Sequence, residues 1–589
     1  MGRWITGRWI TGRQAEILLA SVILTCAGWC ELFSATAGNS LAHGQELPQA
    51  SQSPNKHVDK QVARRTTNRQ LPGYGKQQAD TATLPGSVRN VILMIGDGMG
   101  PQQLGLLEMY AHRAPNSVVP ERTPAIEKMM AEGTLGLVRT EPYGVLVTDS
   151  AAAATQFATG QPARSEMIGT NFQGDTVSNL VEVARQQGKS TGLVTDTRIT
   201  HATPAGFAAH QPHRTMENEV AIDYLNNQVD VLLGGGLRNW VPKAANNSSS
   251  AAAMGIRQLI GNRFSMSSKR KDNRNLLLEA RARYQLAFDR QMLAQVSKGP
   301  LLGLFADSEM QDALTEHGLG DGDQRTQPSL VEMAAKALEL LAQNEQGFFL
   351  MIEGGQIDWA GHNNDVGNLL HELLQFDEVV RYVDHWASQR DDTLLVVTAD
   401  HETGSFGFSY SGSPLPRPQP LSGDVFQQQD YSPYFNFAPL EILDKIYAQK
   451  KSYFQIFQQF DALPAAQQTA EQLVALVNSA LEFDITLDHA VDILARMRNR
   501  QFVAGHPYLG TETVPRIRDF SEFFIFGEFS RMNLLGRAVA SQQNVVWGTG
   551  THTSTPVVLV AKGPAAHRFG GMHHSTEIGQ RLMELLRDE

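Results

Sequence analysis

Ser150 lies where an apolar run gives way to small helix-forming residues, in the sequence Val145-Leu-Val-Thr-Asp-Ser-Ala-Ala-Ala-Ala154. The pattern predicts a strand over 144–147 and a helix that begins at Ser150. The first turn of a helix offers free backbone N–H groups and the positive end of the helix dipole, and both suit a bound phosphate or a developing alkoxide. The position therefore favours a serine nucleophile. Taken alone, however, the Thr-Asp-Ser sequence could serve only as a helix cap.

A glutamate, an aspartate and a histidine follow the apolar run 348–352. Glu353 ends the predicted strand, and Asp358 and His362 come four residues apart. On a helix, this spacing puts a carboxylate and an imidazole on one face, where both can hold one metal ion. A surface contact between Asp358 and His362 would have the same spacing, so the pair alone is a weak zinc signal.

Another aspartate–histidine pair, Asp400 and His401, follows the apolar run 394–397. Neighbouring strand residues point to opposite faces, so both can reach one ion only where the strand breaks, and Gly404 indicates such a break. His552 precedes the run 557–560, where a lone histidine is commonly an ordinary loop residue. Five residues lie at strand ends of one predicted sheet, and this shared position favours a common site: Asp97, Ser150, Glu353, Asp400 and His552.

The composition limits the chemistry of such a site. Cys26 and Cys30 are the chain's two cysteines, and both lie in the predicted leader. Every metal ligand of the mature chain is then a histidine, a carboxylate or a hydroxyl, which favours zinc and magnesium. The net charge of −11 argues against nucleic acid as a partner. It does not argue against a phosphorylated small molecule, because a local metal cluster outweighs a diffuse surface charge.

These residues need a sheet to position them. Buried apolar runs alternate with helical periodicity, which predicts an α/β fold with one large, mainly parallel central sheet and helices on both faces. The segment of about 404–544 lies between His401 and His552 and is expected to form an insertion subdomain. We expect strands over 90–95, 192–194, 231–233, 301–305, 348–352, 394–397 and 557–560, and helices over 177–187, 330–342, 369–386 and 487–498.

The first residues have the pattern of an export signal. Three arginines, a short apolar run and Ala35-Thr-Ala37 predict a signal peptide over 1–37. The alternative is a membrane anchor, but the apolar run is shorter than the ~20 residues that span a bilayer, so we expect no stable anchor after cleavage. The polar segment 38–87 is expected to be a flexible linker before a catalytic domain over 88–589. We therefore expect a periplasmic or extracellular protein.

Seven motifs resemble those of the alkaline phosphatase family and occur in the family's order. They cover about 90–565, apart from the insertion, and seven matches in order are far more specific than any one of them. The motifs are Ile95-Gly-Asp-Gly-Met-Gly100, Thr148-Asp-Ser-Ala151, His201-Ala-Thr-Pro-Ala205, Leu232-Leu-Gly-Gly-Gly236, Glu353-Gly-Gly-Gln-Ile-Asp358, Thr398-Ala-Asp-His-Glu-Thr-Gly404 and Thr551-His552.

The resemblance implies two zinc ions and one magnesium ion per chain. Its ligand sets are Asp358, His362 and His552 for the first zinc; Asp97, Asp400 and His401, with Ser150, for the second zinc; and Asp97, Thr203 and Glu353 for the magnesium ion. Members of the family commonly form homodimers, so we expect a homodimer here.

Four further residues complete the resemblance. Arg214 matches the phosphate-binding arginine of the family, and we expect Asp149 to orient Arg214 or its loop rather than to bind metal. His201 and Trp359 stand where the best-known bacterial pattern has an aspartate and a lysine. His201 could be an outer partner or an extra ligand of the third ion, so the identity of that ion stays open. Trp359 could alter phosphate affinity or only pack against the site wall.

The resemblance implies an alkaline phosphatase that releases inorganic phosphate from small phosphomonoesters through a phosphoserine intermediate on Ser150. Two alternatives stay open. The same metals could serve a phosphodiesterase or a sulfatase-like hydrolase, although Arg214 would contact oxygens that a diester has substituted. The chain could also be a non-catalytic metal- or phosphate-binding protein.

Overall fold

The computed structural model describes residues 87–261, 263–320, 322 and 324–587, and all of these belong to one compact unit. The predicted signal peptide, both cysteines and the predicted linker up to residue 86 lie outside the described residues. Within the described part of the chain, no helix combines the length and the apolar character needed to cross a bilayer.

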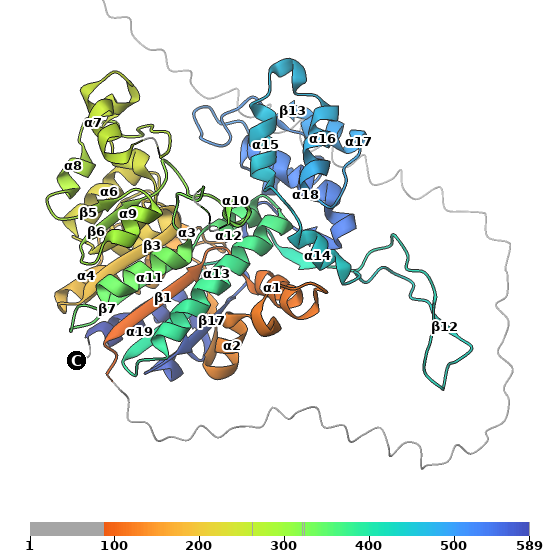
Figure 1. Ribbon diagram of the computed structural model, residues 1–589, viewed down its shortest axis with the longest axis horizontal. Helices are drawn as coiled ribbons and strands as arrows, with labels where there is room; N and C mark the ends of the chain where they lie inside the picture. Colours follow the sequence, from red (N-terminus) through yellow and green to blue (C-terminus); the bar gives the residue numbers. More distant parts are fainter. Residues whose placement is uncertain (1–86, 262, 321, 323, 588–589) are drawn as a thin grey trace, which may run out of the picture. The chain divides into compact units, whose positions relative to one another are not determined.

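A ten-stranded sheet forms the centre of the structure (Figure 1). Nine strands run in the same direction, and β17 runs antiparallel to both of its neighbours. In spatial order the strands are β18 (Gly571–His574), β2 (Thr134–Arg139), β17 (Val557–Lys562), β8 (Thr393–Thr398), β1 (Asn90–Gly96), β7 (Phe348–Gly354), β3 (Ser190–Arg198), β4 (Val231–Gly235), β6 (Leu301–Leu304) and β5 (Gln285–Ala287).

Helices cover both faces of this sheet, which explains why β1, β7 and β8 are buried along their whole length. On one face, α11 (Leu330–Leu341) and α13 (Val366–Ala387) contact each other and the central strands. On the other face lie α3 (Ser150–Thr159), α4 (Leu180–Gln186), α5 (Ala202–Ala208) and α19 (Ser575–Arg587). The predicted α/β fold is confirmed.

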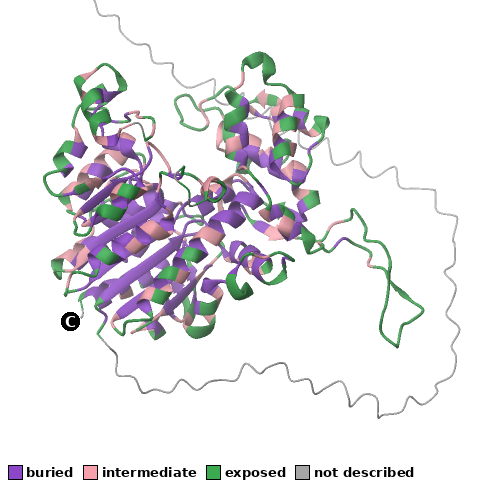
Figure 2. Cartoon of the chain, in the orientation of Figure 1, coloured by how far each residue is buried: buried purple, intermediate pink, exposed green. Residues whose placement is uncertain are grey.

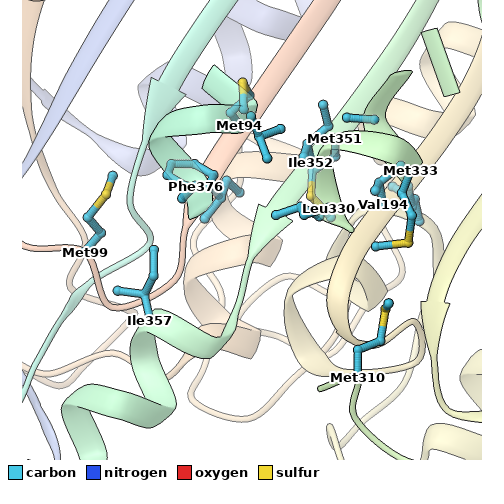
Figure 3. Close-up of a cluster of buried hydrophobic side chains, with 14 of the residues drawn as sticks. Met94, Met99, Val194, Met310, Leu330, Met333, Met351, Ile352, Ile357 and Phe376 are labelled. Carbon is cyan, nitrogen blue, oxygen red and sulfur yellow. The ribbon is translucent and has the colours of Figure 1, made fainter. Parts of the chain in front are cut away.

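The core is tightly packed between the sheet and the first helical face. Figure 3 shows Met94 of β1 close to Phe376 of α13, and Ile352 of β7 close to Leu330 of α11. A Cβ atom on Gly354, at the end of β7, would lie 2.7 Å from the ring of Phe376. The glycine therefore lets α13 approach the strand end that carries the predicted site.

The predicted strand over 144–147 is wrong. This segment is a loop outside the sheet, and Leu146 is 79% exposed. Three apolar residues are too few to define a buried strand, and the chain turns just before them at Gly144, where φ is 80°. One other prediction also needs correction, because the helix over 487–498 ends at Leu494.

The segment 404–544 leaves the sheet and returns close to its starting point. Its entry strand β10 (Phe406–Phe408) pairs with β15 (Val545–Trp547) just after its end. The helices α15 (Tyr453–Asp461), α16 (Ala470–Ala480), α17 (Leu487–Leu494) and α18 (Ser530–Gln543) pack on one another, whereas α14 (Glu441–Tyr447) packs on α1 (Pro101–Arg113) and α13. Figure 2 shows that the hairpin around β12 (Asp430–Tyr431) is largely exposed.

Candidate functional site

Three buried carboxylates meet at the carboxyl edge of the sheet. Asp97 follows β1, Glu353 lies near the end of β7, and Asp400 follows β8, and each is at most 1% exposed. The three strands are parallel neighbours, so their carboxyl ends necessarily lie together. The Gly98 N–H donates to Asp400 Oδ1 at 3.1 Å, which joins the ends of β1 and β8.

The first predicted ligand set is brought together by a helix and a small strand pair. The helix α12 (Gln356–His362) puts His362 Nε2 3.2 Å from Asp358 Oδ2. His552 lies in β16 (His552–Thr553), which pairs with β9 (Glu402–Thr403), and its Nε2 lies 3.5 Å from Asp358 Oδ1. His552 is therefore positioned by this pair and not, as predicted, by an end of the central sheet.

The orientation of the two imidazoles favours a cation between them. His362 Nδ1 lies 2.7 Å from the Gly550 carbonyl oxygen and His552 Nδ1 lies 2.8 Å from that of Thr148, so both Nδ1 atoms act as donors. Each neutral ring then turns the lone pair of Nε2 toward the other, at 3.1 Å. Two facing lone pairs repel each other unless a positive charge lies close to both, and this is the arrangement expected of metal ligands.

The second predicted set is completely buried. His401 Nε2 lies 3.4 Å from Asp97 Oδ1 and 3.2 Å from Asp400 Oδ2. Neither of these oxygens has a hydrogen-bond partner among the described residues. Burial and the charge of Asp358 raise the pKa of Asp400 to about 8, and burial and Asp400 raise the pKa of Asp97 well above its usual value. A cation would remove this cost, so the donor set fits a metal ion.

The third predicted set lies beside His201, which was predicted as an outer partner or an extra ligand. Thr203 Oγ1 donates to Asp97 Oδ2 at 3.1 Å, and Glu353 Oε1 has no hydrogen-bond partner among the described residues. His201 joins Asp97 and Glu353 in a group of donor atoms that lie within 4.8 Å of one another. Trp359 packs edge-on against the His201 ring, with a centroid distance of 5.9 Å.

Ser150 lies beside the second set, at the first residue of α3. Its Oγ is 3.3 Å from His401 Nε2, and its side chain is buried. Asp149 caps the helix by accepting from the N–H groups of Ala151 and Ala152, so the helix start was correctly predicted although the strand before it was not. Arg214 donates to Asp149 Oδ2 at 2.9 Å, next to Ser150.

The sequence model of the family described as alkaline phosphatase matches residues 88–506. The chain belongs to the alkaline phosphatase family. Alkaline phosphatase 4 of Bacillus subtilis is 36% identical over 336 residues, which are 55% of this chain and 64% of that protein, just under two thirds. Alkaline phosphatase 3 of the same organism is 28% identical over 509 residues, which are 85% of this chain and 89% of that protein.

Solved structures of alkaline phosphatases share the fold. The cold-active enzyme from Shewanella is 25% identical, with a TM-score of 0.59, and the match covers 85% of this chain and 100% of that one. The Thermus thermophilus enzyme is 24% identical, with a TM-score of 0.66, and the match covers 88% and 95%. The predicted family is therefore confirmed, and the relatives and solved structures named above are all alkaline phosphatases.

In this member of the family, several residues that hold the predicted ligands in place were not themselves predicted. Thr403 Oγ1 donates to Asp358 Oδ1 at 2.5 Å and lies 3.2 Å from His401 Nδ1, so it joins the two ligand sets. Glu402 accepts from Gln103 Nε2 at 2.8 Å and from the hydroxyl of Thr553. Glu402 and Thr403 belong to the Asp-His-Glu-Thr motif, which was the available signal for them.

Proposed function

We propose that this chain hydrolyses phosphomonoesters and releases inorganic phosphate through a phosphoserine intermediate on Ser150. The observation that carries the proposal is the position of Ser150 Oγ, which is 3.3 Å from His401 Nε2 at the positive end of α3. A hydroxyl there lies next to three carboxylate- and imidazole-rich groups and an anchored arginine. A nucleophile beside an arginine and beside groups that would hold cations is what phosphoryl transfer requires.

The site would hold two zinc ions and one magnesium ion. Asp358, His362 and His552 would hold the first zinc, and Asp97, Asp400 and His401 the second. Asp97, Thr203 and Glu353 would hold the magnesium ion, with His201 as a further donor. When bound, the metals supply Lewis-acid activation and neutralise charge on phosphoryl oxygens. Because an imidazole is a better ligand for zinc than for magnesium, His201 makes zinc the second candidate for the third ion.

The residues of the chain bind and orient the phosphoryl group. Arg214 has a planar fork that matches two oxygens of a phosphomonoester, and Asp149 holds one of its nitrogens at 2.9 Å. Ser150 Oγ forms the bond to phosphorus as the ester oxygen leaves from the opposite side. The positive end of α3 stabilises the negative charge on that serine oxygen.

The proposal can be tested with the purified mature chain. We expect turnover of p-nitrophenyl phosphate far above that of bis-p-nitrophenyl phosphate, with loss of activity on chelation and in Ser150→Ala. Acid quenching followed by peptide mass spectrometry should find phosphate on Ser150. Ser388→Ala, at an exposed helix end, is the matched control and should keep full activity. Preference for the diester or a sulfate ester would overturn the substrate class, and bound zinc without turnover would indicate a binding protein.

We further propose that the chain is exported, that it forms a homodimer, and that it keeps no stable membrane anchor and binds no nucleic acid. The arginine-containing apolar leader supports export. The net charge of −11 argues against binding to nucleic acid. N-terminal sequencing of the mature protein should find its start after Ala37. Sedimentation at two concentrations should give the mass of two chains, and a single-chain mass would contradict the dimer.

A further inference from the structure

An aromatic residue of the segment 404–544 lies directly against the first ligand set. The ring of Phe526 packs edge-on on His362, with a centroid distance of 4.8 Å and an interplanar angle of 77°. Tyr508 also packs edge-on against Phe526, with a centroid distance of 5.2 Å and an interplanar angle of 88°. Phe526 is half-buried and Tyr508 is 46% exposed, so this pair forms part of a surface that extends outward from His362.

The backbone next to Phe526 is fixed to the loop that carries the ligands. The carbonyl oxygen of Phe523 accepts from the Gly550 N–H at 3.1 Å and from Thr549 Oγ1 at 3.0 Å. Asn533, in α18, donates to the carbonyl oxygen of His362 at 2.6 Å. Because the segment is bonded to both sides of the first ligand set, Phe526 keeps its position relative to His362.

A cavity borders Tyr508 of this pair, and a wider hollow adjoins the cavity. A cavity of about 60 Å³ is lined by Tyr508 and by Ile525 and Gly527, the two neighbours of Phe526. A wider hollow of about 660 Å³ shares Arg500 with it and is also lined by Phe502. The wider hollow is lined by the polar residues Arg498, Asn499 and Arg500 together with Met497 and Phe502.

The position of Ser150 decides which part of a substrate would reach this corner. In an in-line displacement the leaving oxygen departs on the side opposite the nucleophile, and in two-metal sites each ion serves one of these two oxygens. Ser150 lies against His401 of the second set. The leaving oxygen is therefore on the side of the first set, and the alcohol part of the substrate extends from there toward Phe526.

We propose that Phe526 and Tyr508 form the binding site for the alcohol part of the substrate and favour phosphomonoesters whose alcohol carries an aromatic ring. This inference rests on the proposed phosphomonoesterase activity. An aromatic ring next to the Phe526–Tyr508 pair gains edge-to-face or offset contacts that an alkyl chain of similar length cannot make. Arg500, in the lining of both hollows, offers a guanidinium plane for the same ring.

The test compares 2-phenylethyl phosphate with n-butyl phosphate, because both esters release a primary alcohol and differ mainly in the ring. We expect the wild type to have a kcat/KM about fivefold higher for the phenylethyl ester, as one aromatic contact would give. In Phe526→Leu this ratio should fall toward one through a loss of kcat/KM for the phenylethyl ester, while zinc content stays near wild type. Phe529→Leu is the matched control, since Phe529 is exposed and stacks on Phe454, and its ratio should not change.

The outcomes separate the inference from the function on which it rests. If the wild type turns over neither ester, the proposed function fails. A wild-type ratio near one overturns the aromatic site alone. If Phe526→Leu lowered kcat/KM equally for both esters, or lost zinc, Phe526 would only pack against His362. Either result would also overturn the proposed aromatic site. Tyr508→Leu is a second variant that touches no ligand, and its ratio should fall by about half.

Discussion

Arg214 Nη1 donates to Asp149 Oδ2 at 2.9 Å, and the same carboxylate caps the helix that begins at Ser150. Burial alone would raise the pKa of Asp149, but Arg214 and three backbone N–H donors lower it, so the carboxylate stays ionised. Asp149 thus fixes both the start of α3 and the guanidinium that would hold phosphate.

Asp149→Asn should weaken phosphate binding, because the amide can still cap α3 but no longer holds Arg214 with a full charge. We expect the inhibition constant of inorganic phosphate to rise about tenfold, as the loss of one charge-assisted contact would give. In the Arg214→Ala background, the same change should have little further effect. An equal effect in both backgrounds would show that Asp149 acts without Arg214.

Glu402 should control zinc affinity although it belongs to no ligand set. Its carboxylate accepts from Gln103 and from Thr553, which follows the ligand His552. Glu402→Ala should lower zinc affinity about tenfold by loosening the β9–β16 pair, and competition with a chelator would measure this change. Glu471→Ala, at an exposed helix start, should bind zinc as the wild type does. Unchanged affinity in Glu402→Ala would contradict the role.

Much of the sheet could be predicted because its central strands are continuous apolar runs. β1, β7 and β8 are covered on both faces, so burial leaves a plain signal in the sequence, and the polar residues after them mark the edge where the site forms. β2 was missed because its residues alternate between exposed and buried, so it has no continuous apolar run. The apolar residues at 144–147 were wrongly predicted to form a strand, since apolar character alone does not reveal whether a partner strand exists.

The outer parts of the site depend on contacts between distant segments. The packing of Phe526 on His362 and the bond from Gln103 to Glu402 join segments far apart in the chain. No local spacing encodes such a contact. Several residues of the three groups could be predicted because they follow a strand, as Asp97 and Asp400 do, or lie one helical turn apart, as Asp358 and His362 do.

His371 should make the folded state less stable in acid. Burial lowers the pKa of His371 to about 4, although its Nε2 lies 2.9 Å from the carbonyl oxygen of Tyr447, and His317 and Asp312 also face it. The unfolded chain takes up this proton near pH 6.5 and the folded one only near pH 4. The free energy of unfolding therefore falls between these values as the pH decreases, by about 3 kcal/mol in total.

The measurement compares urea unfolding of the wild type and His371→Gln at pH 7 and pH 4.5. The glutamine amide can still donate to Tyr447 but takes up no proton, so the variant should lose about 2–3 kcal/mol less than the wild type on acidification. His567→Gln, at an exposed position, should lose as much free energy of unfolding on acidification as the wild type does. An equal loss of unfolding free energy between pH 7 and pH 4.5 in His371→Gln and in the wild type would contradict the prediction.

Gly206 lets the helix that carries Ser150 pack against the helix that carries Thr203. A Cβ atom at Gly206, in α5, would lie 2.9 Å from the Cβ of Ala154 and 3.0 Å from the backbone nitrogen of Thr155, both in α3. Gly206→Ala should therefore force the two helices apart and lower the free energy of unfolding by about 1–3 kcal/mol.

Gly105→Ala is the control for this change, because Gly105 lies inside α1 and a Cβ atom there would meet nothing within 4 Å. That substitution should stabilise the protein by about 0.5–1 kcal/mol, since alanine loses less backbone entropy in a helix. Urea unfolding of both variants measures these opposite changes in the free energy of unfolding. Since α3 carries Ser150, Gly206→Ala should also lower kcat, whereas Gly105→Ala should not. If Gly206→Ala stabilised the protein as Gly105→Ala does, α3 and α5 could move apart without cost.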